Sequence, residues 1–500
     1  MSRTLTANFQ ISVAREASLG VLPGSPSWLR LQPNTITQFG AETSDVSRQP
    51  ISDDRQEYKG EVVDLESRVE VELDLTMDVV MEFLEAFMMA DFVGPQSWIG
   101  SRAPVAVTTD GYTVDAGGAL AAGRLVIARG FQAVGNANNG LKIVTSGSTA
   151  TSVHVAGAVA ELIPLSDGQN QALEECGVQF ASGDVEINAS GNLESTVFDF
   201  TTLPIRDGQL VKIGGSTLAT QYNTVNNNTY ARVAKDGIST NEIVLDWHFL
   251  TPAADPGTGK TIQLLYGPFI RVVPTSHADA LIDRSHTFEG RYTDLAAVGT
   301  PAYEYPEGNM ANTIAFVMPL TQKATTRLAF VGTDTPEPTT VRATNAATAR
   351  MPRRTAAFNT VTKYTRLSIN ELDESGLNTD IKDYTITINN NVSGERVQDT
   401  LGAKYINYGL FQVDIDATML FTDPDIVGAI RNKRTVAFKM GAANVDGGFF
   451  LDIPACTLMT GRRQFPTNES IQIQAPIKPH VGDEFPYVMS WSIFPYLPVA

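Results

Sequence analysis

One segment of the sequence satisfies a relaxed pattern for a phosphate-binding loop. It runs from Ala254 to Thr261 and places Gly259 directly before Lys260. Such a loop binds phosphate when a strand leads into it and a helix begins at the lysine, so that backbone N–H groups face the anion. Here residues 261–270 (TIQLLYGPFI) favour a strand, and the preceding TPAAD favours a turn. The sequence therefore predicts a turn between strands and no phosphate site.

Paired acidic residues are the second group that could do chemistry. A glycosidase needs two carboxylates a few ångström apart in a cleft. The pairs in this chain fall where the sequence predicts turns, helix caps or the outer faces of strands, which favours solvated or capping roles. The pairs are Asp53/Asp54, Glu174/Glu175, Asp414/Asp416 and Asp423/Asp425.

Nucleophiles and metal ligands form no recognisable pattern. Cys176 and Cys456 lie about 280 residues apart, which argues against a disulfide framework or a cysteine metal site. The five histidines are scattered singly, and His248 beside Trp247 is typical of a packed strand residue. No serine lies in a nucleophile-elbow motif. We expect no catalytic, cofactor-binding or metal site, and a protein that is not an enzyme.

An acidic strand is the remaining candidate for a functional surface. Within Glu61–Asp74, apolar residues alternate with Glu70, Glu72 and Asp74, the period of a half-buried strand, and Glu66 continues the same face. Ordinary solvent exposure explains this face. A sharper hypothesis is that it lines a channel in which negative charge keeps a polyanion moving. Asp414 and Asp416 alternate in the same way in a later strand and are candidates for the same lining.

Length, charge and composition limit the class of protein. The chain has 500 residues, enough for about three or four domains. A net charge of −18 argues against a surface that grips nucleic acid. No run approaches the ~20 apolar residues of a membrane helix, and MSRTLTANFQ lacks the apolar region of a secretory signal. We therefore expect no membrane association and synthesis in a cytoplasm. Short runs of Val, Ile, Phe and Thr between glycines and prolines indicate a mainly β (α+β) protein.

One pattern of strand, cap and helix occurs twice. The acidic strand is followed by a predicted helix with Asp78 at its cap or first turn and VVMEFLEAFM after it. Near the other end, alternating residues 411–418 are followed by the capping sequence Thr422–Asp425 and the short helix IVGAIRN. Flanking strands and turns also match. We interpret these as two copies of one domain, formed by residues 1–95 together with 265–335 and by residues 361–500.

Two small β modules are predicted inside the first copy, at residues 96–170 and 171–264. Segment 123–130 (GRLVIARG) is echoed by 208–215 (GQLVKIGG), and 138–144 is echoed by 227–233. Asn-Gly and Gly-Gly pairs between apolar runs are hairpin signals. We expect the modules to project from an exposed loop of the parent domain.

Residues 336–360 read as the linker between the two copies, because bulky apolar residues are few. This segment carries Arg350, Arg353 and Arg354. We expect them to form a subunit-contact arm or a solvated stretch, since three arginines are a weak signal for nucleic-acid binding.

The duplicated unit resembles the major tail tube protein of long-tailed, siphovirus-like bacteriophages. The resemblance is carried by Arg15–Pro23 (REASLGVLP), by residues 70–87 (EVELDLTMDVVMEFLEAF), by SHTFEGRYTD at 285–294, and by residues 383–430. It covers both ends of the chain, roughly 330 residues on the boundaries given above.

The resemblance implies two β-sandwich tube domains, each with a flanking helix. In the family such domains join their sheets into a closed β-barrel ring around a lumen, and rings stack through a long loop and the N-terminal arm. The bridging loop would correspond to Phe39–Lys59 in the first copy and Val392–Tyr408 in the second. Family rings contain six tube domains, so two domains per chain predict a trimer with pseudo-sixfold symmetry; a wrong second-copy alignment would restore a hexamer.

The function implied is a structural virion protein whose hollow tail tube conducts viral DNA into the host without specific binding. The implied partners are further copies of the chain, a tape measure protein, and tail terminator and baseplate or tip proteins. The location implied is the virion tail, with host cytoplasm before assembly. An alternative is a phage tail receptor-binding or carbohydrate-binding protein with the inserts as ligand modules; a tail-associated depolymerase is a third possibility.

Overall fold

The computed structural model is mainly β, as the composition predicts. It describes residues 8–47, 51, 59–99, 102–163, 171–272, 281–297, 300–343, 349–352, 354–359, 364–371, 376–378, 380–422 and 424–498. The chain forms two compact units. Unit 1 comprises residues 1–89, 281–360 and 383–417, and unit 2 comprises residues 90–280, 361–382 and 418–500. Each is treated by itself below.

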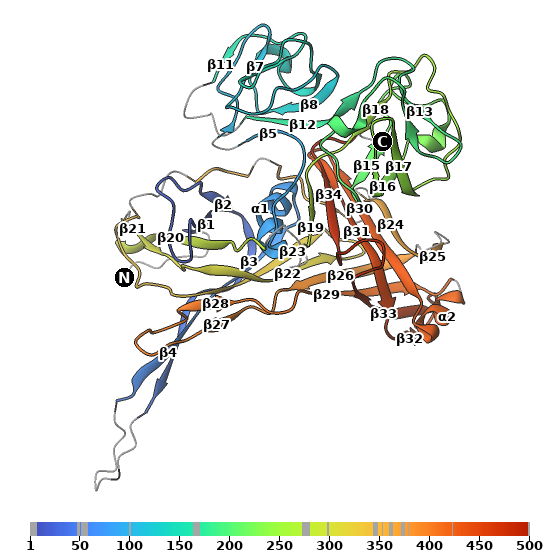
Figure 1. The fold of residues 1–500 in the computed structure, drawn as a ribbon. Coiled ribbons are helices and arrows are strands. Elements are labelled where there is room, and N and C mark those ends of the chain that lie inside the picture. Colours follow the sequence, from blue (N-terminus) through green and yellow to red (C-terminus); the bar gives the residue numbers. More distant parts are fainter. Residues whose placement is uncertain are drawn as a thin grey trace. The chain divides into compact units, whose positions relative to one another are not determined.

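Unit 1 is built on antiparallel strands from distant parts of the sequence (Figure 1). β4 pairs with β3 on one side and β23 on the other; β23 pairs with β22, which also pairs with β26. β1 pairs with β2 and β20, and β20 with β21. The strands are β1 (Phe9–Arg15), β2 (Leu29–Leu31), β3 (Pro33–Val46), β4 (Glu61–Asp74), β20 (Ser285–Ala297), β21 (Thr300–Glu304), β22 (Asn309–Met318), β23 (Thr325–Gly332), β27 (Ser393–Glu395) and β28 (Tyr405–Asn407). β26 (Ile381–Asn389) and β29 (Gln412–Leu420) have residues in both units.

Helix α1 (Met77–Met88) follows β4 directly, as predicted. Thr76 is the N-cap, and its Oγ1 accepts a hydrogen bond from the Val79 N–H at 3.4 Å. Asp78 lies in the first turn, where a carboxylate interacts favourably with the helix dipole. Met89 ends the helix in the left-handed conformation. The buried face of α1 packs through Phe83 and Phe87 against Phe330 of β23, which fixes the helix on the inner side of the sheet.

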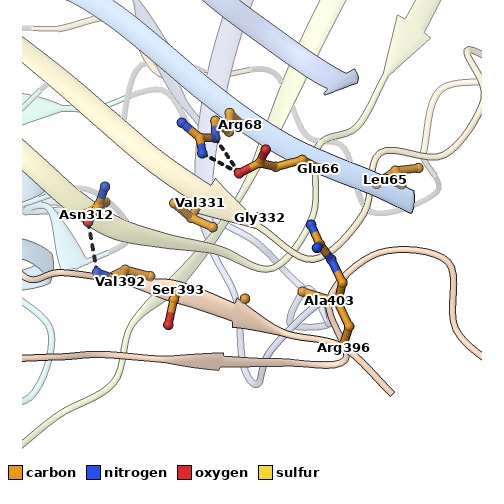
Figure 2. A pocket seen from close by; sticks show the side chains of 11 residues that line it. Leu65, Glu66, Arg68, Asn312, Val331, Gly332, Val392, Ser393, Arg396 and Ala403 are labelled. Carbon is orange, nitrogen blue, oxygen red and sulfur yellow. Dashed lines mark hydrogen bonds and ion pairs between the residues drawn. The ribbon is translucent and has the colours of Figure 1, made fainter. Parts of the chain in front are cut away.

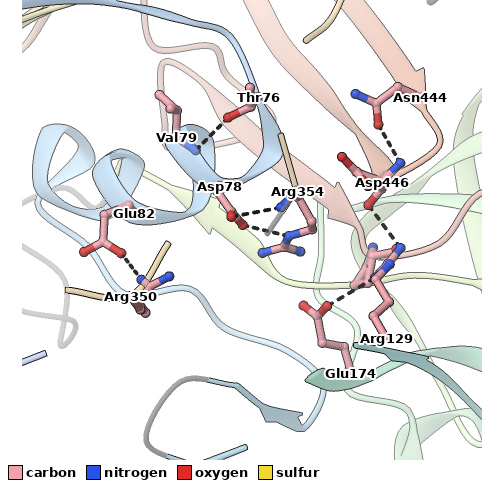
Figure 3. A network of polar contacts seen from close by, with 11 residues as sticks. Thr76, Asp78, Val79, Glu82, Arg129, Glu174, Arg350, Arg354, Asn444 and Asp446 are labelled. Carbon is pink, nitrogen blue, oxygen red and sulfur yellow. Dashed lines mark hydrogen bonds and ion pairs between the residues drawn. The ribbon is translucent and has the colours of Figure 1, made fainter. Parts of the chain in front are cut away.

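The segment after β23 crosses unit 1 and contacts α1. Backbone bridges join Asp334 to Glu307 and Thr339 to Tyr303. Arg350 reaches Glu82 of α1 at 2.7 Å, and Arg354 reaches Asp78 at 3.0 Å (Figure 3). We call the described residues of 334–359 the strap.

The strap corrects an expectation about its arginines. Arg350 and Arg354 do not form a solvated stretch, because their side chains are only 20% and 8% exposed and pair within the chain; a subunit-contact arm stays a prediction. Arg353 lies outside the described residues. The acidic residues of α1 explain why the segment is held there.

Unit 2 contains a second large group of antiparallel strands. β31 pairs with β30, β33 and β34; β24 pairs with β30; β19 pairs with β34. Helix α2 (Asp425–Asn432) lies where the sequence predicts it, with Pro424 at the N-cap. The strands are β19 (Phe269–Arg271), β24 (Tyr364–Glu371), β25 (Gly376–Asn378), β30 (Thr435–Asn444), β31 (Gly447–Leu458), β32 (Arg462–Gln464), β33 (Gln472–Pro479) and β34 (Ser490–Phe494).

The insert region of unit 2 shows the predicted internal echo. β8 pairs with β9, and β15 pairs with β16, each pair joined through a short 3₁₀ turn, η3 (Val134–Asn136) or η5 (Val225–Asn227). β12 joins the halves, since it pairs with both β8 and β18 while β18 also pairs with β15. The strands are β5 (Ser97–Trp98), β6 (Ala106–Val107), β7 (Gly111–Thr113), β8 (Arg124–Arg129), β9 (Gly140–Ile143), β10 (Ser152–His154), β11 (Glu161–Leu162), β12 (Ala172–Gln179), β13 (Glu186–Ile187), β14 (Leu193–Glu194), β15 (Leu210–Ile213), β16 (Tyr230–Ile238), β17 (Glu242–His248) and β18 (Gln263–Leu265), and one further 3₁₀ turn is η4 (Phe200–Thr202).

The insert region packs on the C-terminal strands of unit 2. Tyr230 and Trp247 share one apolar cluster with Phe450 and Phe494. Arg232 of β16 bonds Asp246 at 2.8 Å and Asp452 of β31 at 3.0 Å. Apolar and charged contacts therefore fix the insert region to these strands, and its projection from the parent domain stays a prediction.

Glu174 and Glu175 correct a second expectation. They lie in β12 at 3% and 2% exposure instead of on a solvated surface. Glu175 pairs with Arg124 at 3.1 Å. Glu174 pairs with Arg129 at 3.4 Å (Figure 3). Both faces of β12 are covered, so each carboxylate needs an arginine to offset its desolvation.

The two compact units divide the sequence differently from the predicted domains. Residues 383–417, which we assigned to the second copy, belong to unit 1, and β26 pairs there with β22. Both inserted modules and the C-terminal strands belong to unit 2. The duplication itself stays a prediction.

Candidate functional site

The acidic face predicted on β4 is formed as the alternation requires. Val69, Val71 and Leu73 are buried, while Glu70, Glu72 and Asp74 are half-buried on the opposite face. Glu66 is exposed on that same face. The four carboxylates therefore form one row along the outer side of the sheet.

Cations accompany this row, and the sequence analysis did not include them. Arg327 of β23 lies directly across from Glu72 and bonds it at 2.7 Å. Lys323 bonds Asp74 at 2.6 Å. Arg68, two residues from Glu66 on β4, pairs with it. These groups are substantially exposed, so each pair is worth little in stability and mainly sets the local charge.

Arg68 could have been found from the sequence, because it falls on the acidic face by the same period of two. Arg327 could not. Its position opposite Glu72 depends on the register between β4 and a strand about 250 residues away.

Asp414 and Asp416 lie on the same sheet but not beside the first row. In β29, Val413 and Ile415 are buried and both aspartates are exposed. β29 is a neighbour of β26 (Figure 1), and β26, β22 and β23 separate it from β4. Four strand spacings of ~4.8 Å put the two rows about 19 Å apart.

The strands between the two rows expose small uncharged side chains. On β22 the outward residues include Thr313, Ala315 and Val317; on β26 they include Thr385 and Thr387, directly across from Val317 and Ala315. The outer face therefore has a central band of mostly uncharged side chains, with Asp383 near the start of β26, between two bands that carry more charge. Counted together, the six predicted carboxylates and the three cations beside β4 leave three net negative charges.

Two hairpins meet at one end of this face. β3 and β4 continue into a long hairpin, and β27 and β28 form a shorter one (Figure 1). Arg396, next to β27, bonds Asp64 of β4 at 2.8 Å. A groove of about 260 Å³ lies between them, and the Val392 N–H donates to Asn312 Oδ1 at 2.9 Å on its floor (Figure 2). Residues 48–50 and 52–58 of the predicted bridging loop lie outside the described residues.

The other predicted groups have structural roles. No helix begins at Lys260, and its Nζ donates to the Leu218 carbonyl, so the phosphate-loop segment is a turn as predicted. His248 is a packed strand residue; its Nε2 lies 3.0 Å from the Gly191 carbonyl, and burial lowers its pKa. Asp53, Asp54 and Asp423 lie outside the described residues.

The described residues include neither a metal-binding cluster nor a membrane-spanning helix. No cluster of three or more His, Cys, Asp or Glu among them is placed to hold a metal ion. Within the same residues, no helix combines the length and apolar character needed to cross a bilayer.

Comparison with known proteins decides the family. The sequence model of the family described as phage tail tube protein matches residues 6–481. The chain belongs to this family. No curated protein matches the sequence at a significant level. The matched region spans both predicted tube copies and both inserts, so the resemblance stated from the sequence is confirmed.

Membership makes the chain a structural component of a phage tail. Proteins of this family assemble with copies of themselves into a tube and contact other tail components. The outer face of β4, β23, β22, β26 and β29 is then a candidate wall of a tube, and the two hairpins are candidate contacts between subunits.

Proposed function

We propose that this tail tube protein assembles into stacked hollow rings and that the outer face of the unit 1 sheet lines the lumen. Viral DNA then passes along this face into the host without specific binding. The observation that carries the proposal is the pairing of a charged row with a mostly uncharged band on one continuous sheet. A wall of small uncharged side chains with a modest negative charge offers phosphates no cationic patch to bind.

In this proposal the ring closes by strand pairing between the sheets of neighbouring subunits. Among the described residues no sheet closes into a barrel, so the sheets of one chain have edges that a neighbouring subunit can pair with. Pairing between subunits would cover those edges and form a continuous β-barrel ring. With two tube domains per chain, three chains complete a pseudo-sixfold ring. A tape measure protein fills the lumen before DNA does, and terminator and baseplate or tip proteins close the ends. The protein has no catalytic role and is held in the host cytoplasm before assembly.

Electron microscopy of the purified protein tests assembly directly. We expect hollow rings or tubes whose class averages show sixfold features while the mass per ring corresponds to three chains. Rings with the mass of six chains would replace the trimer by a hexamer. A monodisperse species that never polymerises and binds or cleaves glycan would overturn the proposal.

Charge neutralisation tests which face lines the lumen. The triple variant E70Q/E72Q/D74N removes three carboxylates and leaves Arg68, Arg327 and Lys323 in place, so the counted charges become balanced. We expect assembly to survive and DNA delivery to fall, because phosphates then meet exposed cations. The matched control D110N/D236N/D483N removes three exposed carboxylates from unit 2. Equal infectivity of both variants and the wild type would defeat the lumen assignment.

The receptor-binding alternative is less well supported by the inserts. Carbohydrate sites commonly present aromatic rings to solvent, yet the large aromatic side chains here are core residues. Trp98, Tyr112, Tyr222 and Trp247 are at most 3% exposed. We therefore assign the inserts a structural role on unit 2.

A further inference from the structure

Two arginines of unit 1 share a single amide oxygen. On neighbouring strands, Gln10 of β1 lies directly across from Arg291 of β20, and Ser12 of β1 lies across from Arg30 of β2. Directly opposed residues of an antiparallel pair project from the same face. Gln10 Oε1 accepts from Arg30 Nη1 at 2.5 Å and from Arg291 Nη1 at 3.4 Å.

This arrangement holds two positive charges together without an acid. No described carboxylate forms an ion pair with Arg30 or Arg291, although the chain has 55 acidic against 37 basic residues. Burial and the neighbouring Arg291 charge lower the pKa of Arg30. Arg291 Nε is buried and has no hydrogen-bond partner.

A third arginine of the same unit, Arg342, is paired with a carboxylate in the usual way. Arg342 holds the buried Glu289 with two hydrogen bonds of 2.9 and 2.8 Å. Glu289 lies only two residues from Arg291 on β20, but its two oxygens are occupied by Arg342 and Tyr305. The Arg30–Arg291 pair therefore lacks an anion that the fold supplies elsewhere.

A cavity adjoins the pair and has room for one side chain. Its volume is about 420 Å³, and Arg30 and Gln10 form part of its wall. Polar atoms come from Gln32, Asn34 and Thr35, and apolar surface comes from Phe9, Ile11 and Ile36. Guanidinium groups bind planar anions with two parallel hydrogen bonds, which favours a carboxylate.

We propose that this cavity binds the carboxylate of an aspartate or glutamate side chain from a second copy of the chain. The inference rests on the proposed self-assembly and specifies one contact within it. Each neighbour in a tube has a net charge of −18 and presents acidic side chains at high local concentration. A carboxylate docked against Arg30, which lines the cavity, offsets the repulsion between Arg30 and its neighbour Arg291. The arginine pair is therefore unfavourable in the free subunit and stabilised in the assembled one.

The double variant R30Q/R291Q tests the contact. We expect the protein concentration needed for tube formation to rise roughly ten-fold or more, because a charge-assisted pair is lost between subunits. Thermal unfolding of the unassembled subunit should be unchanged or slightly raised, because a like-charge repulsion disappears. A merely structural arginine pair predicts the reverse, a less stable subunit with unaltered assembly. The matched control R102Q/R206Q replaces two exposed arginines of unit 2 and should leave both readouts at wild-type values.

Two further experiments test which chain supplies the anion and whether the anion is a carboxylate. Asp294 is the next acidic residue after Arg291 in the sequence, so D294N checks for a carboxylate from the same chain. A lower unfolding temperature of the unassembled D294N subunit would show that the same chain supplies the anion and would overturn the proposal. Unfolding of the wild-type subunit is also followed in acetate, phosphate and chloride at equal ionic strength. Stabilisation by acetate that R30Q/R291Q abolishes supports a carboxylate site; stabilisation by phosphate alone contradicts it. If the wild type forms no tubes, the proposed function fails; if wild type and double variant assemble alike, only this inference fails.

Discussion

Helices α1 and α2 follow the same sequence pattern but lie in different surroundings. Eight of the 12 residues of α1 are buried, against two of the eight residues of α2. The first-turn acid of α1, Asp78, is buried and paired with Arg354, whereas the first-turn acid of α2, Asp425, is exposed. α2 ends with Arg431 in its last turn and Lys433 at its C-cap, and α1 has no basic residue there. Both helices end in a left-handed residue with φ of 48°.

The comparison shows that the formation of a helix and its burial have different causes. Alternation, cap and helical period determine that each helix forms, and both sequences satisfy them. How deeply each helix is buried depends on which other segments of the chain pack over it. For α1 that cover is the strap together with Arg15 of β1, which bonds Glu85 at 2.7 Å. If these covering segments cause the difference, matched substitutions should destabilise α1 more than α2.

Removing the largest buried side chain of α1 should give the largest effect. Phe83 is fully buried against Phe330 and His286. F83A should lower the free energy of unfolding of unit 1 by about 3–5 kcal/mol, because a cavity replaces an aromatic ring. V427A in the half-buried face of α2 should cost about 1 kcal/mol or less. Hydrogen exchange of amides 77–88 and 425–432 measures both; equal costs would show that the two helices are covered alike.

Breaking the contact between strap and helix should be nearly as damaging. D78N removes the carboxylate that pairs with the buried Arg354 side chain, which should cost about 3 kcal/mol. D425N in α2 removes an exposed first-turn carboxylate, whose interaction with the helix dipole is worth ~0.3–1 kcal/mol. Amide exchange of residues 354–359 should accelerate in D78N together with that of α1. Acceleration of α1 alone would mean that the strap is held by other contacts.

Acidification should affect α1 before α2. His286 is fully buried beside Phe83, neither ring nitrogen has a hydrogen-bond partner, and burial, with Arg15 and Arg284, lowers its pKa to about 3. The unfolded chain takes up this proton near pH 6.5 and the folded chain only near pH 3. Stability is therefore complete above about pH 6.5 and falls by ~1.4 kcal/mol per pH unit below it, or about 2 kcal/mol at pH 5. The slope for amides 77–88 should flatten in H286L; an unchanged slope would assign the effect to carboxylates.

The smallest expected effect concerns the N-caps. T76A removes the side-chain hydrogen bond to the Val79 N–H and should destabilise α1 by about 1 kcal/mol. T422A, upstream of the Pro424 cap of α2, should change little because that cap has no side-chain hydrogen bond. Exchange of the first-turn amides reports both. A larger loss of helix stability in T422A than in T76A would contradict the view that only the cap of α1 depends on a side-chain hydrogen bond.

Local features of the fold follow from the sequence with little ambiguity. The alternation in Val69–Leu73 predicts both the strand β4 and its outward acids, because the side-chain period of a strand is two. The echo of 123–130 in 208–215 predicts two similar hairpins, β8–β9 and β15–β16. These signals are local, so no knowledge of distant partners is required.

The features that could not be predicted all depend on distant pairing. Glu174 and Glu175 look like solvated acids until Arg124 and Arg129 are placed beside them. Low apolar content made the strap look like a free linker, although Phe358 within it is fully buried. The grouping of 383–417 with unit 1 depends on the β22–β26 register, which spans about 70 residues. The position of Arg327 opposite Glu72 of β4 could not be predicted for the same reason.

The pairing of β1 with β20 also determines when unit 1 can form during synthesis. Phe9 lies directly across from Tyr292, so β1 has only the short strand β2 as a partner until about 280 further residues have been made. At ~5–20 residues per second, this delay is roughly 15–55 seconds. The hairpins β8–β9 and β15–β16 close within about 30 residues and are complete long before. A nascent chain therefore holds folded insert hairpins while the edge of β1 that later pairs with β20 is still open.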